Sequence, residues 1–139
     1  MTPDAQRFTL TARLTWFAML VATGVYFMAL TVIVGSAPQA APDVTTLRYV
    51  LMAAAGVVIG AIYVFRRRLP LDALAGKPVP APAEVFGSYV VCWALSESVG
   101  LFGLVLGIVG RSVAEAQPFL VVAAALLIWQ RPRPAHFGA

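Results

Sequence analysis

The residue best placed to do chemistry is Glu97, an acidic residue inside a long apolar segment. No other charged residue lies between Glu84 and Arg111. A segment of this length and hydrophobicity is typical of a membrane span, which would put the carboxylate near the bilayer midplane. An acidic residue there costs about 2.5 to 3.5 kcal/mol on insertion, so it is expected to be protonated, paired or holding an ion. Glu97 is therefore the first candidate for a functional site.

Two serines flank Glu97 and are the nearest candidate partners. Ser96 and Ser98 can donate hydrogen bonds to the anion, or they can bond back to helix carbonyls four residues earlier. Apolar neighbours such as Trp93 and Leu101 remove water from the carboxyl group, which disfavours its charged form. A carboxyl group in such a setting can hold a proton and exchange it when water or a cation approaches. The candidate ion-binding residues are thus Glu97, Ser98 and Ser96.

No second set of reactive residues accompanies Glu97. The chain has one cysteine, Cys92, and one histidine, His136, which lies near the end. These two residues make neither a disulfide framework nor a set of metal ligands. The sequence also lacks a Ser-His-Asp set, a phosphate-binding loop and a second acid within an apolar segment. We therefore expect no enzyme activity, no metal and no cofactor other than a proton or a sodium ion.

Composition indicates that the lipid bilayer is the solvent of this chain. Of its 139 residues, 60% are hydrophobic and 12% are charged, and the mean hydropathy is +0.85. Soluble domains carry about 25% charged residues. The net charge of +4 comes from basic residues that flank apolar segments, and no nucleic-acid-binding signature accompanies them. No loop reaches the size of about 50 residues at which folded domains begin, so residues 1–139 are expected to form one domain.

Four apolar segments are long enough to cross a bilayer, and their apolar runs are continuous, which favours helices over strands. The sequence thus predicts an all-α fold, an integral membrane bundle of four transmembrane helices spanning about 14–34, 47–65, 86–109 and 113–130. The first segment has about 20 apolar residues, more than a signal peptide, so we expect it to be retained. Pro118 should lie in the first turn of the fourth helix, where its missing N–H is tolerated.

The basic residues predict the orientation of these helices. Eight of the ten fall before the first span, between the second and third, or after the fourth: Arg7, Arg13, Arg66, Arg67, Arg68, Lys77, Arg131 and Arg133. By the positive-inside rule, both termini and the proline-rich loop 69–83 are cytoplasmic. Prolines in that loop favour an extended connector. Several aromatic residues near the span ends fit an interfacial belt, in which we include Tyr26.

Small residues follow one face of the third span at steps of three or four: Cys92, Ser96, Gly100, Gly103, Gly107 and Gly110. Such a face lets membrane helices approach closely. The second span carries Gly56 and Gly60 at the same spacing, so we expect the second and third spans to pack together. Glu97 lies on the flank of this face, from which it could meet another subunit, a neighbouring helix or a narrow aqueous path.

Residues 94–105, from Ala94 to Val105, resemble the ion-binding outer helix of the rotor proteolipid, the c subunit of rotary ATP synthases and ATPases. The shared pattern is Ala-Leu, a small polar residue, Glu-Ser, a small residue, Leu-Phe, then Gly-Leu and aliphatics. The resemblance implies that Glu97 is the proton or sodium carboxylate and Ser98 a second ligand. Phe102 stands where that family usually has a tyrosine, whose hydroxyl steadies the carboxylate. The rest of the chain departs from the family.

Two functions remain open from the sequence. In the first, Glu97 takes up and releases a proton or a sodium ion. In the second, the chain is a non-catalytic structural or accessory subunit of a larger membrane complex, in which Glu97 stays protonated or pairs with another chain. A second polar residue facing Glu97 would favour the first, and the other spans offer only threonines such as Thr23. In both cases we expect a multi-pass protein of a prokaryotic inner (cytoplasmic) membrane, in a homo-oligomer or with other membrane subunits.

Overall fold

The computed structural model describes residues 3–36, 42–68, 81–133 and 137, and these are all-α with no strand among them. The four helices are α1 (Pro3–Gly35), α2 (Thr45–Arg68), α3 (Pro82–Gly110) and α4 (Val113–Trp129). Three of them, α1, α2 and α3, are long and apolar enough to cross a membrane. The fourth is apolar but shorter, with 17 residues.

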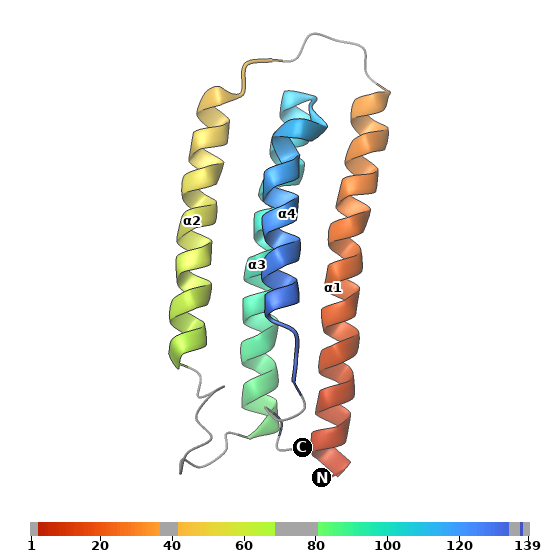
Figure 1. Ribbon diagram of the computed structural model, residues 1–139, viewed down its shortest axis with the longest axis vertical. Coiled ribbons are helices and arrows are strands. Elements are labelled where there is room, and N and C mark those ends of the chain that lie inside the picture. Colours follow the sequence, from red (N-terminus) through yellow and green to blue (C-terminus); the bar gives the residue numbers. More distant parts are fainter. Residues whose placement is uncertain (1–2, 37–41, 69–80, 134–136, 138–139) are drawn as a thin grey trace.

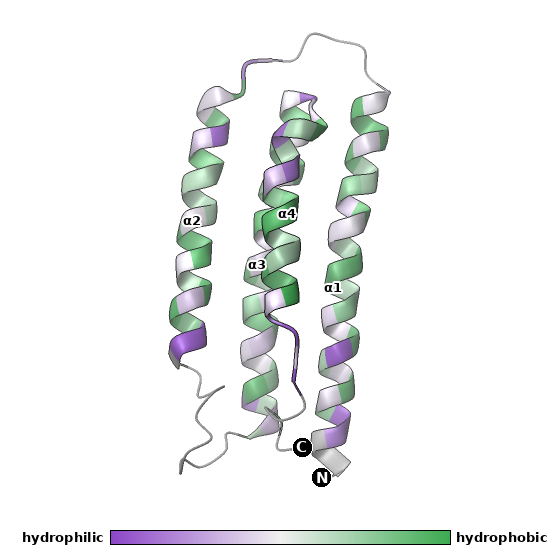
Figure 2. Cartoon of the chain, in the orientation of Figure 1, coloured by the Kyte–Doolittle hydropathy of each residue, from purple (hydrophilic) through white to green (hydrophobic). Residues whose placement is uncertain are grey.

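The helices run up and down as a bundle, with α3 and α4 in the middle and α1 and α2 on either side (Figure 1). At the lower end of Figure 1, α1 and α3 begin and α2 ends; at the upper end, α1 and α3 end and α2 and α4 begin. Hydrophilic residues gather toward the two ends and hydrophobic residues fill the length between them (Figure 2). This distribution suits a protein whose middle is surrounded by hydrocarbon.

Helix ends follow local chemistry more than hydropathy. α3 begins at Pro82, the last proline of the predicted connector, because proline is tolerated at the first helical position; residues 69–80 of that connector lie outside the described part. Before α2, the Asp43 carboxylate accepts the backbone N–H of Thr45 at 2.9 Å. Hydrogen bonds from Thr45 hold the pKa of Asp43 below its usual value. α1 begins at Pro3, well before the apolar segment predicted to start at residue 14.

A two-residue turn joins α3 and α4. Arg111 adopts the left-handed conformation (φ 49°, ψ 37°), and the Ser112 N–H donates to the Gly107 carbonyl at 3.0 Å. The left-handed conformation costs a non-glycine residue about 1 to 2 kcal/mol. Because the turn is so short, the two helices lie antiparallel and side by side.

The small residues of α3 are buried where α4 and α1 cross it. A Cβ added at Gly103 would lie 2.7 Å from the Phe119 Cβ and 2.9 Å from the Ala116 carbonyl oxygen. One added at Gly107 would lie 2.8 Å from both the Ala116 Cβ and the Leu30 side chain. α3 and α4 therefore approach to a distance that only glycine permits at these positions.

The predicted close contact of α2 with α3 through glycine is not what the structure has. A Cβ added at Gly56 or Gly60 would have no neighbouring atom within 4 Å. α2 does pack on α3, but through residues other than these two glycines, among them the buried Ala55, which lies in one apolar cluster with Val99. The helix that packs closely on the glycines of α3 is α4, because the two-residue turn holds α4 against that face of α3.

α4 ends above the lower end of the bundle, and its last carbonyls meet donors from all three other helices. The Trp16 Nε1 donates to the Leu127 carbonyl at 2.7 Å, and the Trp93 Nε1 to the Gln130 carbonyl at 3.2 Å. Arg66 lies over the ring of Trp129, 3.9 Å from its centroid, and donates to its carbonyl at 3.4 Å. These contacts satisfy carbonyls that the end of any helix leaves without partners.

Pro118 is inside α4, at its sixth residue, and not in the first turn as the sequence predicted. Because proline has no N–H, the carbonyl of Ala114 four residues earlier loses its usual helical donor. Both residues face the side of α4 that looks toward α2.

Candidate functional site

Glu97 lies near the middle of α3 on the side that faces α1. The hydroxyl of Tyr26, on α1, donates a hydrogen bond to the Glu97 Oε1 at 2.6 Å. This distance lies within the range of about 2.5 to 2.7 Å for an O–H···O bond to a carboxylate. The bond joins two helices far apart in the sequence and places a second polar group directly on the carboxylate.

Packing holds the Tyr26 ring in place. Tyr26 belongs to a cluster around the buried Leu30, together with Leu104 of α3. A Cβ added at Gly100, one turn beyond Glu97, would lie 3.9 Å from the Tyr26 Cδ2, an ordinary van der Waals distance. The phenol ring therefore lies against α3 next to the carboxylate.

The carboxylate is partly buried and is not enclosed within this single chain. Among the described residues, Tyr26 is its hydrogen-bond partner, through Oε1, and no such partner is found for Oε2. Glu97 therefore keeps one oxygen open to lipid, to water or to another chain.

The two serines predicted as ligands bond back to their own helix. The Ser96 hydroxyl donates to the Cys92 carbonyl at 2.8 Å, and the Ser98 hydroxyl donates to the Leu95 carbonyl at 2.7 Å. Neither hydroxyl forms a hydrogen bond with the Glu97 carboxylate. These bonds are the alternative that the sequence left open, and they occur because a serine hydroxyl readily satisfies itself on the preceding turn.

Ser96 belongs instead to a second buried polar group, with Gln130 after α4. The Gln130 Nε2 donates to the Ser96 hydroxyl oxygen at 2.9 Å, and Gln130 is only 2% exposed. Its Oε1 has no partner in the described part of the chain. Ser96 and Glu97 are adjacent in sequence but point to different neighbours, α4 and α1 respectively.

The remaining residues singled out by the sequence lie elsewhere. Phe102, at the place of the expected tyrosine, packs in the cluster of Val99 and Ala55 on the side toward α2. The hydroxyl that does contact Glu97 comes from Tyr26 on α1. At the upper end, Arg48 and Glu115 form an ion pair at 3.1 Å. No group of three or more potential metal ligands occurs among the described residues.

Sequence reasoning missed Tyr26 and Gln130. Tyr26 was assigned to the interfacial belt, although it lies well inside the first apolar segment, and that depth was the signal available. Gln130 was taken only as the end of the fourth span, next to Arg131.

Fold and site together define an all-helical protein with three helices long and apolar enough to cross a membrane, and with a carboxylate–tyrosine pair between two of them. Comparison of the chain with protein-family models, with curated protein sequences and with solved structures gave no match.

Proposed function

We propose that this chain is a four-span membrane protein that takes up and releases a proton at Glu97, with Tyr26 as the group that orients the carboxyl. The observation that supports it is the 2.6 Å hydrogen bond from the Tyr26 hydroxyl to the Glu97 Oε1. An acid within an apolar segment needs such a partner, because an isolated charge in hydrocarbon is costly. A phenol can stay bound to the carboxyl group in both of its protonation states, since it donates to the carbonyl oxygen or to the anion.

A proton suits these ligands better than a sodium ion. Hard cations take several oxygen ligands at once. The described residues offer one carboxylate and one hydroxyl at this place, because Ser96 and Ser98 are engaged elsewhere. A proton needs only the carboxylate, so we place it ahead of sodium.

The proton would exchange with the side on which the termini lie. α4 ends level with Trp93, which is one turn from Glu97, or about 6 Å along the helix. Beyond that level the chain continues with the exposed Arg131 and Arg133. Glu97 therefore lies about one turn from the level at which α4 ends, and the distribution of basic residues favours the cytoplasm for that side.

A second candidate function follows from the open Oε2 of Glu97. A basic or hydroxyl group from another subunit could complete the site, and the chain would then be an accessory subunit in which Glu97 stays in one state. The partial exposure of Glu97 is the observation that favours this alternative.

Labelling with a hydrophobic carbodiimide separates the two candidates, because the reagent attacks protonated carboxyl groups in apolar surroundings. The full chain in lipid should acquire one adduct, at Glu97, and more of it at lower pH. Glu115, paired with Arg48, is the internal control and should stay unmodified. Sodium chloride should protect no better than potassium chloride if the ligand is a proton.

The variant Glu97→Gln should assemble as the wild type does and lose the adduct. Tyr26→Phe should keep the adduct but react at a different rate, since the carboxyl loses its hydrogen bond. Labelling that is independent of pH, or confined to other acids, would leave the accessory function standing alone. Selective protection by sodium would show that the ion bound at Glu97 is sodium and not a proton.

A further inference from the structure

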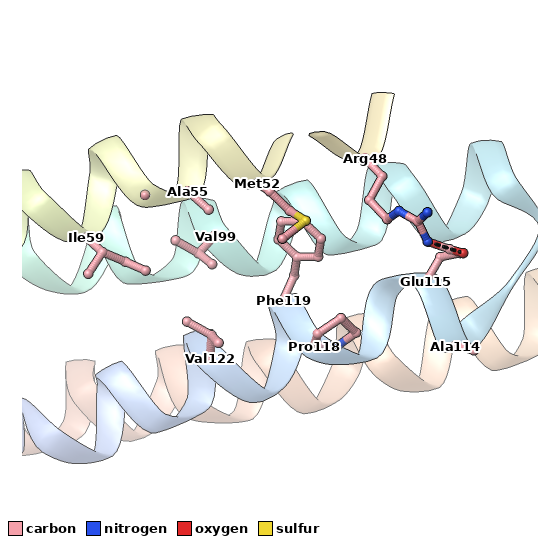
Figure 3. A pocket seen from close by; sticks show the side chains of 11 residues that line it. Arg48, Met52, Ala55, Ile59, Val99, Ala114, Glu115, Pro118, Phe119 and Val122 are labelled. Atoms are coloured by element: carbon pink, nitrogen blue, oxygen red, sulfur yellow. Dashed lines mark hydrogen bonds and ion pairs between the residues drawn. The ribbon is translucent and has the colours of Figure 1, made fainter. Parts of the chain in front are cut away.

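A groove runs along the outside of the bundle between α2 and α4, with α3 as its floor (Figure 3). Its volume is about 350 Å³. Met52 and Ile59 line it from α2, Phe119 and Val122 line it from α4, and Val99 forms part of the floor. The groove exists because α2 packs mainly on α3, so that α2 and α4 do not meet along their length.

The length of the groove matches one leaflet of a bilayer. It extends along α2 from Arg48 to Ile59, twelve residues whose eleven steps rise about 16 Å. Half of a hydrocarbon core about 30 Å thick is about 15 Å. Apolar walls of that length fit one extended acyl chain lying parallel to the helices.

One end of the groove is charged. At the upper end, the Arg48 Nη1 donates to both oxygens of Glu115, at 3.1 and 3.2 Å (Figure 3). The side chains are 40% and 27% exposed. One guanidinium nitrogen makes both bonds, so within the described residues the other nitrogens of Arg48 keep their hydrogens for a further acceptor. Glu115 likewise has lone pairs left for a further donor.

The charges at this end balance. The charged residues described at this end are two acids, Asp43 and Glu115, and two arginines, Arg48 and Arg111. A purely anionic headgroup would be attracted by one pair and repelled by the other. A zwitterionic headgroup complements them, because its phosphate can accept from Arg48 while its ammonium donates to Glu115.

We propose that the groove between α2 and α4 is a binding site for one phosphatidylethanolamine molecule of the leaflet at the upper end. One of its two acyl chains lies against Met52, Ile59 and Val122, and its phosphate accepts from the free nitrogens of Arg48. Its primary ammonium donates to Glu115, which the quaternary ammonium of phosphatidylcholine cannot do. The site is independent of Glu97 and rests only on the chain lying in a bilayer.

Native mass spectrometry of the full chain tests this proposal. The protein in detergent is offered phosphatidylethanolamine, phosphatidylcholine and phosphatidylglycerol with identical acyl chains. We expect one retained phosphatidylethanolamine, favoured over either competitor by about tenfold, the factor that one good polar contact of about 1.4 kcal/mol supplies. Equal retention of the three lipids would overturn the headgroup assignment.

Two glycines on α2 provide a matched pair of variants. Gly56 lines the groove and Gly60 does not, while a Cβ at either would have no neighbour within 4 Å. Gly56→Trp should fill the groove and lower lipid retention about tenfold or more, whereas Gly60→Trp should retain lipid as the wild type does. Equal loss in both variants would overturn the groove as the site.

Variants at the charged end test the headgroup contacts. Arg48→Gln should weaken the binding of phosphatidylethanolamine. Glu115→Gln should abolish the preference for phosphatidylethanolamine over phosphatidylcholine. Thermal melting followed by circular dichroism, recorded in the same detergent, shows that each variant is folded. A Gly56→Trp variant that loses a dimer and keeps its lipid would assign the groove to a second copy of the chain and overturn the proposal.

Discussion

The two glycine-containing faces of this bundle have the same spacing and opposite surroundings. On the α3–α4 seam, the contact of Gly103 and Gly107 with α4, an added Cβ would meet another atom at 2.7 to 2.8 Å. On the open α2 face, formed around Gly56 and Gly60, an added Cβ would meet nothing within 4 Å. Four-residue spacing of small residues therefore indicates that another helix can approach closely. It does not show that a helix does so, or which helix it is.

What separates the two faces is chain connectivity. A turn of two residues, Arg111 and Ser112, holds α4 against α3. α2 is connected to α3 through residues 69–81, and its polar contacts with α4 lie at the two ends of α4: the pair of Arg48 and Glu115, and the contact of Arg66 with Trp129. The seam is thus completed within one chain, and the open α2 face is not covered by any of the described residues.

The largest effect should come from filling the seam. Gly103→Leu forces a side chain against the Ala116 carbonyl oxygen, which would lie 2.9 Å from the new Cβ and cannot move without shifting α4. We expect a loss of about 3 kcal/mol in the free energy of unfolding, the upper end for overpacking. Denaturant unfolding in mixed micelles, followed by circular dichroism, measures it.

Gly56→Leu, the same exchange on the open α2 face, is the control. It should change the free energy of unfolding by less than about 0.5 kcal/mol, as for most surface positions. Equal losses at Gly103 and Gly56 would show that the two faces do not differ in solution.

A smaller loss in the free energy of unfolding is expected where α4 ends against α3. Trp93→Phe keeps an aromatic ring but removes the N–H that donates to the Gln130 carbonyl, in a place where Trp93 is fully buried. An unpaired buried carbonyl costs about 1 to 3 kcal/mol. The same unfolding measurement on Trp129→Phe, whose ring is 53% exposed, should show a smaller loss. If Trp129→Phe costs more, the end of α4 is not held through Trp93.

The smallest effect should lie between α2 and α4. Arg48 and Glu115 are both partly exposed, so their coupling should be at most about 1 kcal/mol and should fall as salt is added. A double-mutant cycle of Arg48→Gln and Glu115→Gln measures this coupling. A coupling of several kcal/mol, insensitive to salt, would mean that α2 is held to α4 as firmly as α3 is.

Hydropathy was sufficient to predict the all-α fold and the order of the helices. The second and third spans, predicted at 47–65 and 86–109, lie within α2 (Thr45–Arg68) and α3 (Pro82–Gly110). The start of α1 was missed by eleven residues, because hydropathy marks the apolar part of a helix and not its backbone hydrogen bonds. The fourth helix is present, with the 17 residues of Val113–Trp129.

Contacts between helices were predictable only in part. The sequence identified Glu97 as the acid to examine, but which side chain of α1 reaches it depends on how the two helices are rotated about their axes. Tyr26 and Thr23 are less than one turn apart, and only the packed structure selects Tyr26. The same rotation turns Ser96 toward Gln130 and away from the carboxylate.

The central claim is that the Glu97 carboxyl group changes its protonation state while bonded to Tyr26. Its side-chain carbon can be observed by ¹³C NMR of the selectively labelled chain in lipid, with Glu97→Gln used to assign the signal. We predict that lowering the pH moves the signal from the position of an ionised carboxyl group to that of a protonated one, and that Tyr26→Phe alters these positions because the hydrogen bond to Oε1 is lost. A signal that stays constant over the whole pH range in which the protein remains folded would contradict the claim.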